Sequence, residues 1–355
     1  MYKSLKGDGS NWSHNGGSGA MHRLTSTGFN AAPTWKSAAA ILLLSALALW
    51  CAAGPAQAED AKVRIFSGTD EHWVPFLVAK AKGYFADEGL DAEVTVFTTG
   101  ATAVEAFRAG RGDFVSAGDL PSAAMWQSGN VIGLAPTSSD TDIFGIVGRN
   151  DINSPADLRG RKVATRMGST GEFLLDRYLA SGGLSPADVK LLDLAPPDMV
   201  VALAHGDIDA FAWLAPFTTR AIASAPNVKL IASAKGLANN RIILSVTKSF
   251  AAQHPDLVRK VLHATERAID FVRANPQEAT EIWAQAVQGD AKQSVPVVRL
   301  IHFDMTFNGA FVSDMDELAK FMVQKGALKG PINWSTAMNT AFLHEVDPKL
   351  VATSP

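Results

Sequence analysis

"TGATAVEAFRAGRGDFVSAG" (99–118) and "APPDMVVALAHGDIDAFAWL" (195–214) follow one pattern at a constant offset. Each begins with an apolar-faced helical segment, continues with Gly-x-x-Asp and ends in a short apolar run. Gly110 falls on Gly206, where a glycine is suited to end a helix, and the aspartate that follows opens a strand. The repeat predicts that one helix-to-strand step of a doubly wound α/β lobe occurs twice in the chain.

The sequence around each copy alternates short apolar runs with amphipathic segments. Around the first copy we expect strands at 62–66, 92–97 and 113–117 and helices at 73–85, 101–109 and 121–128. Around the second we expect strands at 162–167, 189–194 and 209–213 and helices at 171–182 and 198–205. Later strands are expected at 227–233 and 241–247, then helices up to Val346 that start near Pro255, Pro276, Pro296 and Pro331.

Strands that alternate with helices indicate βαβ units around mostly parallel sheets. We therefore predict an α/β fold of two doubly wound lobes that form a clamshell, with the second lobe inserted into the first. The chain then passes between the lobes twice, at 144–150 and again at 241–247. Lobe one is predicted to comprise 63–148 plus 241–346, and lobe two 149–240.

A hydrophobic segment near the start of the sequence has the features of an export signal. Residues 37–53, SAAAILLLSALALWCAA, are uncharged and are followed by Ala-Gln-Ala at 56–58. A basic flank, a short apolar core and an A-x-A site are typical of a secretory signal peptide, whereas about 20 apolar residues are needed to span a bilayer. Trp50 precedes Cys51 where lipoprotein signals have a small residue, which argues against a lipid anchor. We predict that 1–58 is a signal peptide with an N-terminal extension, and that the exported protein is periplasmic without membrane insertion.

Composition narrows the class of protein further. The 355 residues carry 32 Lys and Arg against 35 Asp and Glu, a formal net charge of −3. A mildly acidic chain without a basic stripe argues against binding to nucleic acid or to anionic lipid. The one cysteine, Cys51, lies in the predicted leader, so the exported protein would have no disulfide, thiolate metal site or cysteine nucleophile. We expect a monomer without a cofactor or metal.

Four segments together carry a family resemblance: AKAKGYFADEGLDAEV (79–94), AGRGDFVSAGDLPSA (109–123), INSPADLRGRKVATRMGSTGEFLLDRYLASGGL (152–184) and HGDIDAFAWLAPF (205–217). They resemble the nitrate/sulfonate/taurine family of ABC-importer solute-binding proteins, over Val63 to Val346. The resemblance implies a type II periplasmic binding protein fold. It also implies that the chain captures a small organic anion and delivers it to a permease that works with ATPase subunits.

The sequence departs from the family at one informative place. Many members carry Trp-Asp-Pro-aromatic where this chain has Leu214-Ala215-Pro216-Phe217. A carboxylate that family members can place near the ligand is therefore missing. The resemblance does not extend to taurine or alkanesulfonate specificity.

The loop MGSTGEF (167–173) is the most informative candidate for ligand binding, because ligands of open α/β sheets bind beyond the carboxyl ends of strands. A predicted strand runs into Gly168, Ser169 and Thr170 and then into a helix, which leaves N–H groups and hydroxyls at a positive helix end. This arrangement predicts an anion site without lysine. The alternative is that Ser169 and Glu172 form only a capping box; the resemblance favours the ligand site.

The corresponding loops of lobe one supply weaker candidates. Thr99, Gly100 and Ala101 precede the first repeat helix and form a similar nest of donors. Asp119 either accepts a hydrogen bond from an amino or hydroxyl group of the ligand or caps the helix that starts near Pro121.

The remaining candidates are Asp70, His72, Trp73, Trp213, Pro216 and Arg241. His72 either donates to the ligand or is solvated. The two tryptophans either form apolar walls of the site or belong to the core. Arg241 either pairs with a carboxylate or sulfonate or is a member of a structural ion pair.

Three acids at the edge of lobe one, Asp70, Glu71 and Asp119, would repel a bare nitrate or sulfate, which favours an organic ligand with both an acceptor and a donor end. A pyrimidine or aromatic ligand is the alternative within the same family. A pyrimidine-precursor synthase resembles this family too, but relies on a cysteine-rich segment that this chain lacks. The effector domain of a transcription regulator is a further rival, which a leader peptide disfavours.

Overall fold

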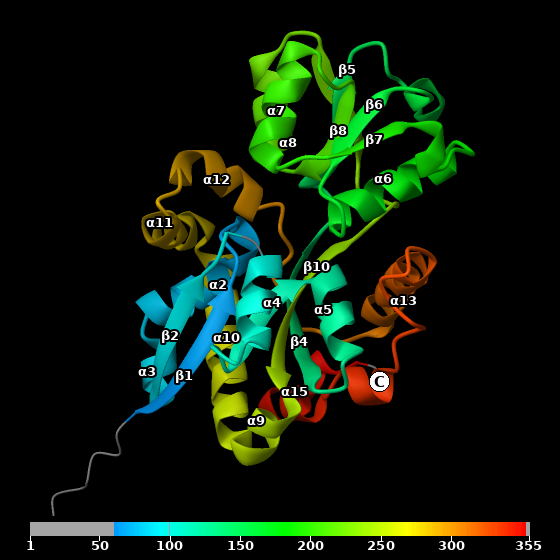
Figure 1. The fold of residues 1–355 in the computed structure, drawn as a ribbon. Coiled ribbons are helices and arrows are strands. Elements are labelled where there is room, and N and C mark those ends of the chain that lie inside the picture. The colour runs from blue at the N-terminus through cyan, green and yellow to red at the C-terminus, as the bar shows by residue number, and fades with distance from the viewer. Residues whose placement is uncertain (1–59, 99, 353–355) are drawn as a thin grey trace, which may run out of the picture. The chain divides into compact units, whose positions relative to one another are not determined.

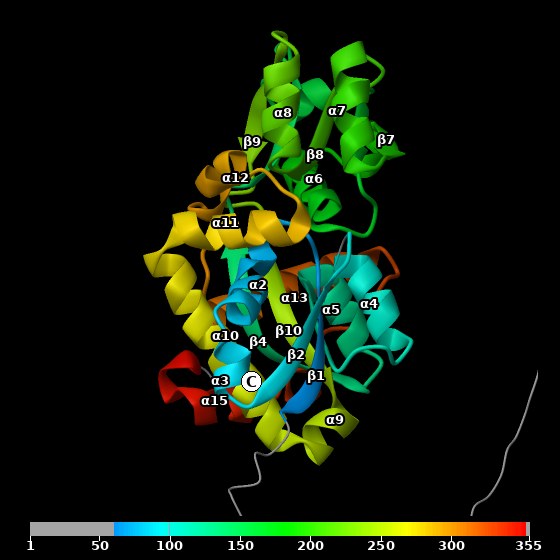
Figure 2. The same ribbon diagram turned by 90° about the vertical axis from the view of Figure 1, so that its left-hand side faces the viewer.

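The structure, a computed structural model, describes residues 60–98 and 100–352. These residues form two five-stranded mixed sheets, each covered by helices (Figures 1 and 2). The predicted α/β class is confirmed. Within the described ranges no helix has both the length and the apolar character that a membrane span requires. The predicted leader, 1–58, lies outside the described residues.

The first sheet has the strand order β2-β1-β3-β10-β4. Its strands are β1 (Ala61–Ser67), β2 (Leu90–Val96), β3 (Phe114–Gly118), β4 (Val131–Asp140) and β10 (Asn240–Thr247). Strand β1 is parallel to β2 and β3, whereas β10 is antiparallel to both of its neighbours. The helix α2 (Val74–Ala81) packs with α10 (Pro255–Ala274) and α11 (Pro276–Val287), and α5 (Asp119–Trp126) packs with α4 (Gly100–Arg108) and α13 (Gly309–Gln324).

The second sheet repeats this arrangement with the order β7-β6-β8-β5-β9. Its strands are β5 (Phe144–Arg149), β6 (Lys162–Thr165), β7 (Lys190–Asp193), β8 (Ala210–Leu214) and β9 (Val228–Ser233). Three strands are again parallel, and the antiparallel member is again the strand that arrives from the other sheet. The helices α6 (Thr170–Ser181), α7 (Pro196–His205) and α8 (Phe217–Ser224) pack against it.

The sequence repeat is the step from α4 to β3 in the first sheet and from α7 to β8 in the second. Gly110 and Gly206 both have left-handed backbone conformations, with φ of 74° and 87°. The Asp113 carboxylate accepts a hydrogen bond from the Arg64 N–H of β1 at 2.8 Å. Asp209 accepts from the N–H of Lys162 in β6 at 2.9 Å. The repeated aspartate therefore fixes the start of β3 to β1 in the first sheet and the start of β8 to β6 in the second.

The chain passes from the first sheet to the second at 141–143, between β4 and β5, and returns at 234–239, between β9 and β10. We call these segments the outward and return crossings. Strand β5 pairs with β8 and β9, so 144–148 belongs to the second sheet, although our lobe limits place these residues in lobe one. The limits of the lobes as rigid units stay a prediction.

Most expected elements coincide with observed ones, and three differ for clear reasons. The helix expected over 73–85 is divided into α2 and α3 (Tyr84–Asp87), because Gly83 adopts φ of 75°. Strand β4 was not predicted, since its nearly continuous burial leaves no alternation to detect. Pro296 lies inside α12 (Ala291–Val298), whose start is instead capped by Asp290 accepting from the Gln293 N–H.

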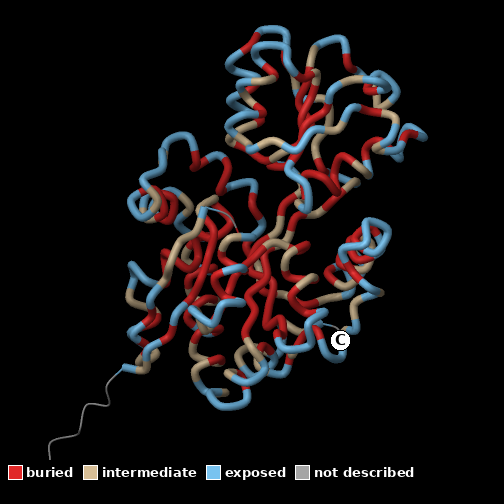
Figure 3. Tube along the Cα trace, in the orientation of Figure 1, coloured by how far each residue is buried: buried red, intermediate tan, exposed pale blue. Residues whose placement is uncertain are grey.

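The remaining short elements complete the covering of the first sheet and the connections of the second. They are α9 (Lys248–Gln253), α14 (Trp334–Ala337), α15 (Ala341–Val346) and the 3-10 helices η1 (Glu71–Trp73), η2 (Pro155–Leu158), η3 (Pro186–Asp188) and η4 (Pro348–Leu350). Buried residues concentrate along the strands of both sheets and on the inward faces of the helices (Figure 3).

Candidate functional site

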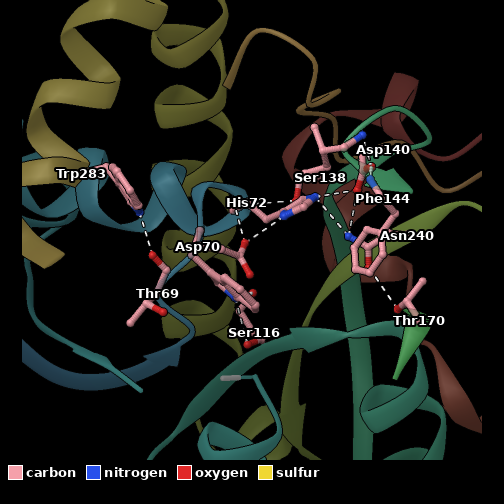
Figure 4. Close-up of polar contacts among 12 residues, drawn as sticks. Thr69, Asp70, His72, Ser116, Ser138, Asp140, Phe144, Thr170, Asn240 and Trp283 are labelled. Atoms are coloured by element: carbon pink, nitrogen blue, oxygen red, sulfur yellow. Dashed lines mark hydrogen bonds and ion pairs between the residues drawn. The ribbon is translucent and has the colours of Figure 1, made fainter. Parts of the chain in front are cut away.

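A buried polar network joins η1 to the points where both crossings leave the first sheet (Figure 4). His72 Nδ1 lies 2.8 Å from an oxygen of Asp70, and its Nε2 lies 2.9 Å from Asp140 Oδ2. Asn240 donates through Nδ2 to the same Asp140 oxygen at 3.0 Å. Asp140 is the last residue of β4 and Asn240 the first of β10, and the two are register partners. We call Asp70, His72, Asp140 and Asn240 the crossing network.

The two aspartates set the charge of His72. Burial alone would lower the pKa of this imidazole, but the hydrogen bonds to Asp140 and Asp70 and the charges of both carboxylates outweigh it and raise the pKa to about 10. His72 is therefore an imidazolium that donates from both ring nitrogens. Asn240 Nδ2 lies 3.1 Å from His72 Nε2 because both nitrogens donate to one carboxylate oxygen. With a residue exposure of 1%, His72 is not solvated.

A second set of contacts joins loops of the two sheets. The Thr170 hydroxyl, in the first turn of α6, donates to Asp119 Oδ1 at 3.0 Å, with Asn240 Oδ1 as a second acceptor at 3.3 Å. Asp119 begins α5 at the carboxyl end of β3, and its Oδ1 also accepts from the Leu120 N–H at 2.7 Å. Two residues that the sequence proposed separately, Asp119 and Thr170, are thus hydrogen-bonded to each other.

Among the described residues, no cationic side chain donates a hydrogen bond to Asp119 as the His72 imidazolium does to Asp140. Burial raises the pKa of its carboxyl to about 6, and the hydrogen bonds from Leu120 and Thr170 together with the charge of Arg241 reduce the rise. A pKa of about 6 places the titration of this carboxyl just below neutral pH.

The loop before α6 forms half of the capping box that the alternative predicted, because Glu172 bonds to the Gly168 N–H and not to that of Ser169. Ser169 accepts from the Glu172 N–H, and Glu172 accepts from the Gly168 N–H at 2.7 Å. Gly168, with φ of 73°, is exposed, whereas Thr170 is buried. A capping role for Ser169 is therefore present, and its predicted contact with a ligand stays a prediction.

Trp73 fills the space beside two glycines of the first sheet's loops. Its Nε1 donates to the carbonyl and hydroxyl of Ser116, both at 3.1 Å. A Cβ at Gly68 would lie 2.5 Å from the indole, and one at Gly100 would lie 3.3 Å from it. With 4% exposure, Trp73 belongs to the core. Ala101 is exposed at the start of α4, and Thr99 lies outside the described residues.

The candidates at the end of β8 are less buried. Trp213 is half-buried, and its ring centroid lies 6.0 Å from that of Phe144. A Cβ at Gly171 would meet Trp213 at 3.0 Å, so the glycine permits close packing of α6 on this indole. Pro216 is half-buried and caps α8.

Arg241 is a member of an ion pair, as the structural alternative predicted. Its Nε donates to Asp314 Oδ2 on α13 at 3.2 Å, and its guanidinium lies over the Phe311 ring at 5.4 Å. Asn239 donates to the same carboxylate oxygen at 3.0 Å. The return crossing is thus held by α13 on one side and by the crossing network on the other.

The three acids expected to repel small anions are all engaged. Asp70 pairs with His72, and Asp119 accepts from Thr170. Glu71 is 2% exposed; burial raises the pKa of its carboxyl, and a hydrogen bond from Ser294 of α12 partly offsets the rise. The sequence argument that these three acids would repel a bare nitrate or sulfate therefore loses its basis.

A cavity of about 310 Å³ adjoins Asp119. Its lining includes Phe173 and Arg177 of α6, Leu237 of the return crossing and Asp314 of α13. A larger cavity of about 1010 Å³ lies along β2 and is lined by none of the predicted site residues. Searching the described residues finds no group of three or more His, Cys, Asp or Glu side chains that could hold a metal ion.

Sequence reasoning missed Asp140 and Asn240. Asp140 is the last residue of β4, where the chain leaves the first sheet. Asn240 is the first residue of β10, where the chain returns to it. The signal available in the sequence was a polar residue at the end of one buried strand and another at the start of a second, each next to a predicted crossing. Because strand β4 was not predicted, Asp140 could not be assigned to a strand end.

The fold matches solved solute-binding proteins. The crystal structure of the periplasmic aliphatic sulphonate binding protein from Escherichia coli superposes with a TM-score of 0.70 at 19% identity, over 79% of this chain and 92% of that one. A desulfurization enzyme also superposes, with a TM-score of 0.62 at 14% identity over 81% and 98%. The class defined by the two sheets and their crossings is the type II periplasmic binding protein fold, which also supports enzymes.

Sequence relatives narrow the class to a family. A binding protein of Brucella abortus is 27% identical over 312 residues, covering 82% of this chain and 94% of its own. The taurine-binding periplasmic protein of Escherichia coli is 28% identical, covering 76% of this chain and 83% of its own. A family model described as NMT1/THI5 like matches residues 71–279. The chain belongs to this family, and the predicted resemblance is confirmed.

Proposed function

We propose that the protein captures a small organic anion between its two lobes in the periplasm and delivers it to an ABC permease and its ATPase subunits. The observation that carries the proposal is the hydrogen bond between Thr170 and Asp119. It joins a loop at the carboxyl end of a first-sheet strand to a loop in the same position of the second sheet. In α/β sheets such loops are where ligands bind.

The ligand is proposed to have two different ends. Its anionic end would lie at the start of α6, where Ser169 and Thr170 supply hydroxyls at the positive end of the helix dipole. Its donor end would reach Asp119, which accepts hydrogen bonds in its ionised form. The adjoining cavity of about 310 Å³ has opposite charges in its lining, from Arg177 and Asp119, and is of a size that holds a small solute.

An aromatic or pyrimidine ligand is the second candidate. The half-buried Trp213, packed edge-on against the buried Phe144, offers an aromatic ring at the end of β8. The Leu214-Ala215-Pro216-Phe217 stretch beside them has no carboxylate to repel an aromatic π-face. Ring stacking there would select a flat ligand.

A thermal-shift screen over taurine, alkanesulfonates, aromatic carboxylates, pyrimidines and nitrate separates these candidates. A ligand present at about 100 times its dissociation constant stabilises the folded protein by about 2.7 kcal/mol. Mass spectrometry of the recovered ligand tests whether the protein is a binder or an enzyme, since a binder returns the ligand unaltered. Absence of stabilisation by every compound, together with conversion of one of them, would overturn the proposal.

Substitutions then test the anion end. Ser169→Ala and Thr170→Ala should each weaken binding, because loss of a hydrogen bond to a charged group typically costs about 1.5–3 kcal/mol, or roughly 10- to 150-fold in affinity. Ser185→Ala is the matched control, because Ser185 is also an N-cap serine, here in a capping box with Asp188 at η3, away from the predicted loops. Equal losses of melting temperature in all three variants with unchanged affinity would show that Ser169 and Thr170 are structural residues only.

A further inference from the structure

The crossing network lies at the two places that any movement between the sheets must involve. Asp140 closes β4 immediately before the outward crossing, and Asn240 opens β10 immediately after the return crossing. They are register partners in adjacent antiparallel strands, so the two connections leave the first sheet side by side.

One carboxylate binds both connections. Asp140 Oδ1 accepts from the N–H groups of Ile143 and Phe144, at 3.1 and 3.3 Å, which lie at the end of the outward crossing and the start of β5. Its Oδ2 accepts from His72 and from Asn240. The Asp140 side chain has no solvent exposure, so its charge depends on these donors.

His72 is the cationic member of the crossing network and is itself fixed on several sides. Its backbone N–H donates to Asp70 at 3.1 Å, and its carbonyl accepts from the Ser138 hydroxyl at 3.3 Å (Figure 4). Both ring nitrogens are occupied by carboxylates. The imidazolium therefore attaches the strand ends at both crossings to the loop that follows β1.

We propose that His72 is a positioning residue for ligand capture: through Asp140 and Asn240 it holds the first-sheet ends of both crossings. Movement between the sheets is then confined to 141–143 and 234–239. The ligand meets two loops whose relative position is already restricted, because Thr170 bonds to Asn240 and Asp119. This inference rests on the proposed two-lobed capture, but the restriction itself exists without any ligand.

A separate contact provides an internal comparison. Lys325, just after α13, lies 3.1 Å from Glu172 of α6, and the Phe321 and Phe173 rings lie 5.1 Å apart. This contact also joins an element that packs on the first sheet to one that packs on the second. Releasing it with Lys325→Ala leaves the crossing network untouched.

The test measures the distance between the sheets in the empty protein by double electron–electron resonance. In the full chain with Cys51→Ser, spin labels at Glu105→Cys and Val201→Cys sit at equivalent exposed positions of the repeat, on α4 and α7. A double variant that carries His72→Gln and Asp140→Asn keeps hydrogen-bonding groups at both positions and removes the charges of the imidazolium and the carboxylate. Asn240→Ala releases the return crossing from Asp140 and also removes the second acceptor of the Thr170 hydroxyl, which keeps its bond to Asp119.

Both variants should broaden the distance distribution by about twofold, since a restricted equilibrium is released to further conformers. Asp113→Asn, which loses a carboxylate in the same sheet away from the crossings, should leave the distribution unchanged. An unchanged distribution in both network variants overturns the proposal, and so does broadening in Lys325→Ala alone. Because no ligand is added, a failed ligand screen does not alter this result.

Discussion

Two buried aspartates, Asp140 and Asp119, stand at comparable places and have opposite surroundings. Asp140 faces the His72 imidazolium, the Asn240 amide and two backbone N–H groups. Asp119 faces one hydroxyl and the backbone N–H groups of Leu120 and Arg241, and the Arg241 guanidinium is engaged by Asp314. A buried charge with a full set of donors is fixed in place, whereas one with few donors is easily protonated or redirected. The first arrangement suits a permanent connection, and the second suits a group that must change partners when a ligand enters.

The largest expected effect comes from removing the cation at Asp140. His72→Ala leaves the Asp140 carboxylate buried without its charged partner, which should lower the free energy of unfolding by about 3–5 kcal/mol. Urea unfolding measures this loss. His72→Gln with Asp140→Asn removes both charges together and should cost clearly less. Equal losses in the single and double variants would show that the imidazolium is not the counter-ion of Asp140.

A pH titration of stability separates His72 from Asp119 by the pH range in which each contribution is lost. Since the pKa of His72 is raised from 6.5 to about 10 by its carboxylate partners against the effect of burial, its contribution is complete below pH 6.5 and is lost as pH rises through about 10. The melting temperature should therefore fall between pH 7 and pH 10.5 more steeply than in the variant carrying both His72→Gln and Asp140→Asn. Parallel curves for the two proteins would contradict a raised pKa.

The contribution of Asp119 to stability should change at acidic pH, and its protonation should also affect ligand binding. Burial raises its pKa from 3.8 to about 6, so its contribution to folding is present below pH 3.8 and is lost as pH rises through about 6. A ligand whose donor end needs the ionised Asp119 carboxylate should bind more tightly as that form becomes populated. Its affinity should rise about tenfold from pH 5 to pH 7.

Calorimetry with a ligand found in the screen measures this rise, and Asp119→Asn should abolish it. The other charged groups around this position are Arg241 of β10, Arg177 of α6 and Asp314 and Glu317 of α13. If the pH dependence persists in Asp119→Asn, the titrating group is one of the surrounding acids or belongs to the ligand.

The sequence predicted the repeated units of this fold better than the contacts between them. Gly-x-x-Asp is a local pattern, because the glycine conformation and the aspartate bond to the neighbouring strand depend on a few residues in each copy. Asp119 and Thr170 were predicted because each lies at a strand-to-helix loop. Their mutual bond, and the meeting of His72 with Asp140 and Asn240, depend on crossings that bring distant segments together. Nothing in the local sequence of His72 separates a solvated histidine from one held between two carboxylates.

The smallest expected effect tests whether the repeat is physical. Asp113 and Asp209 occupy equivalent positions and hold equivalent backbone N–H groups, but both pair with arginines that are partly exposed, Arg64 and Arg161. Exposed ion pairs contribute about 0–1 kcal/mol, and a typical hydrogen bond contributes about 0.5–1.5 kcal/mol. Asp113→Asn and Asp209→Asn should therefore each lower the free energy of unfolding by about 1 kcal/mol, because an amide oxygen still accepts from the strand while the charge is lost.

Hydrogen exchange at the backbone N–H groups of Arg64 and Lys162 should quicken only in the sheet that carries the substitution. If Asp113→Asn quickens exchange in β6 as strongly as in β1, the sheets unfold as one unit, and the separation into a fixed connection at Asp140 and an adjustable contact at Asp119 loses its basis.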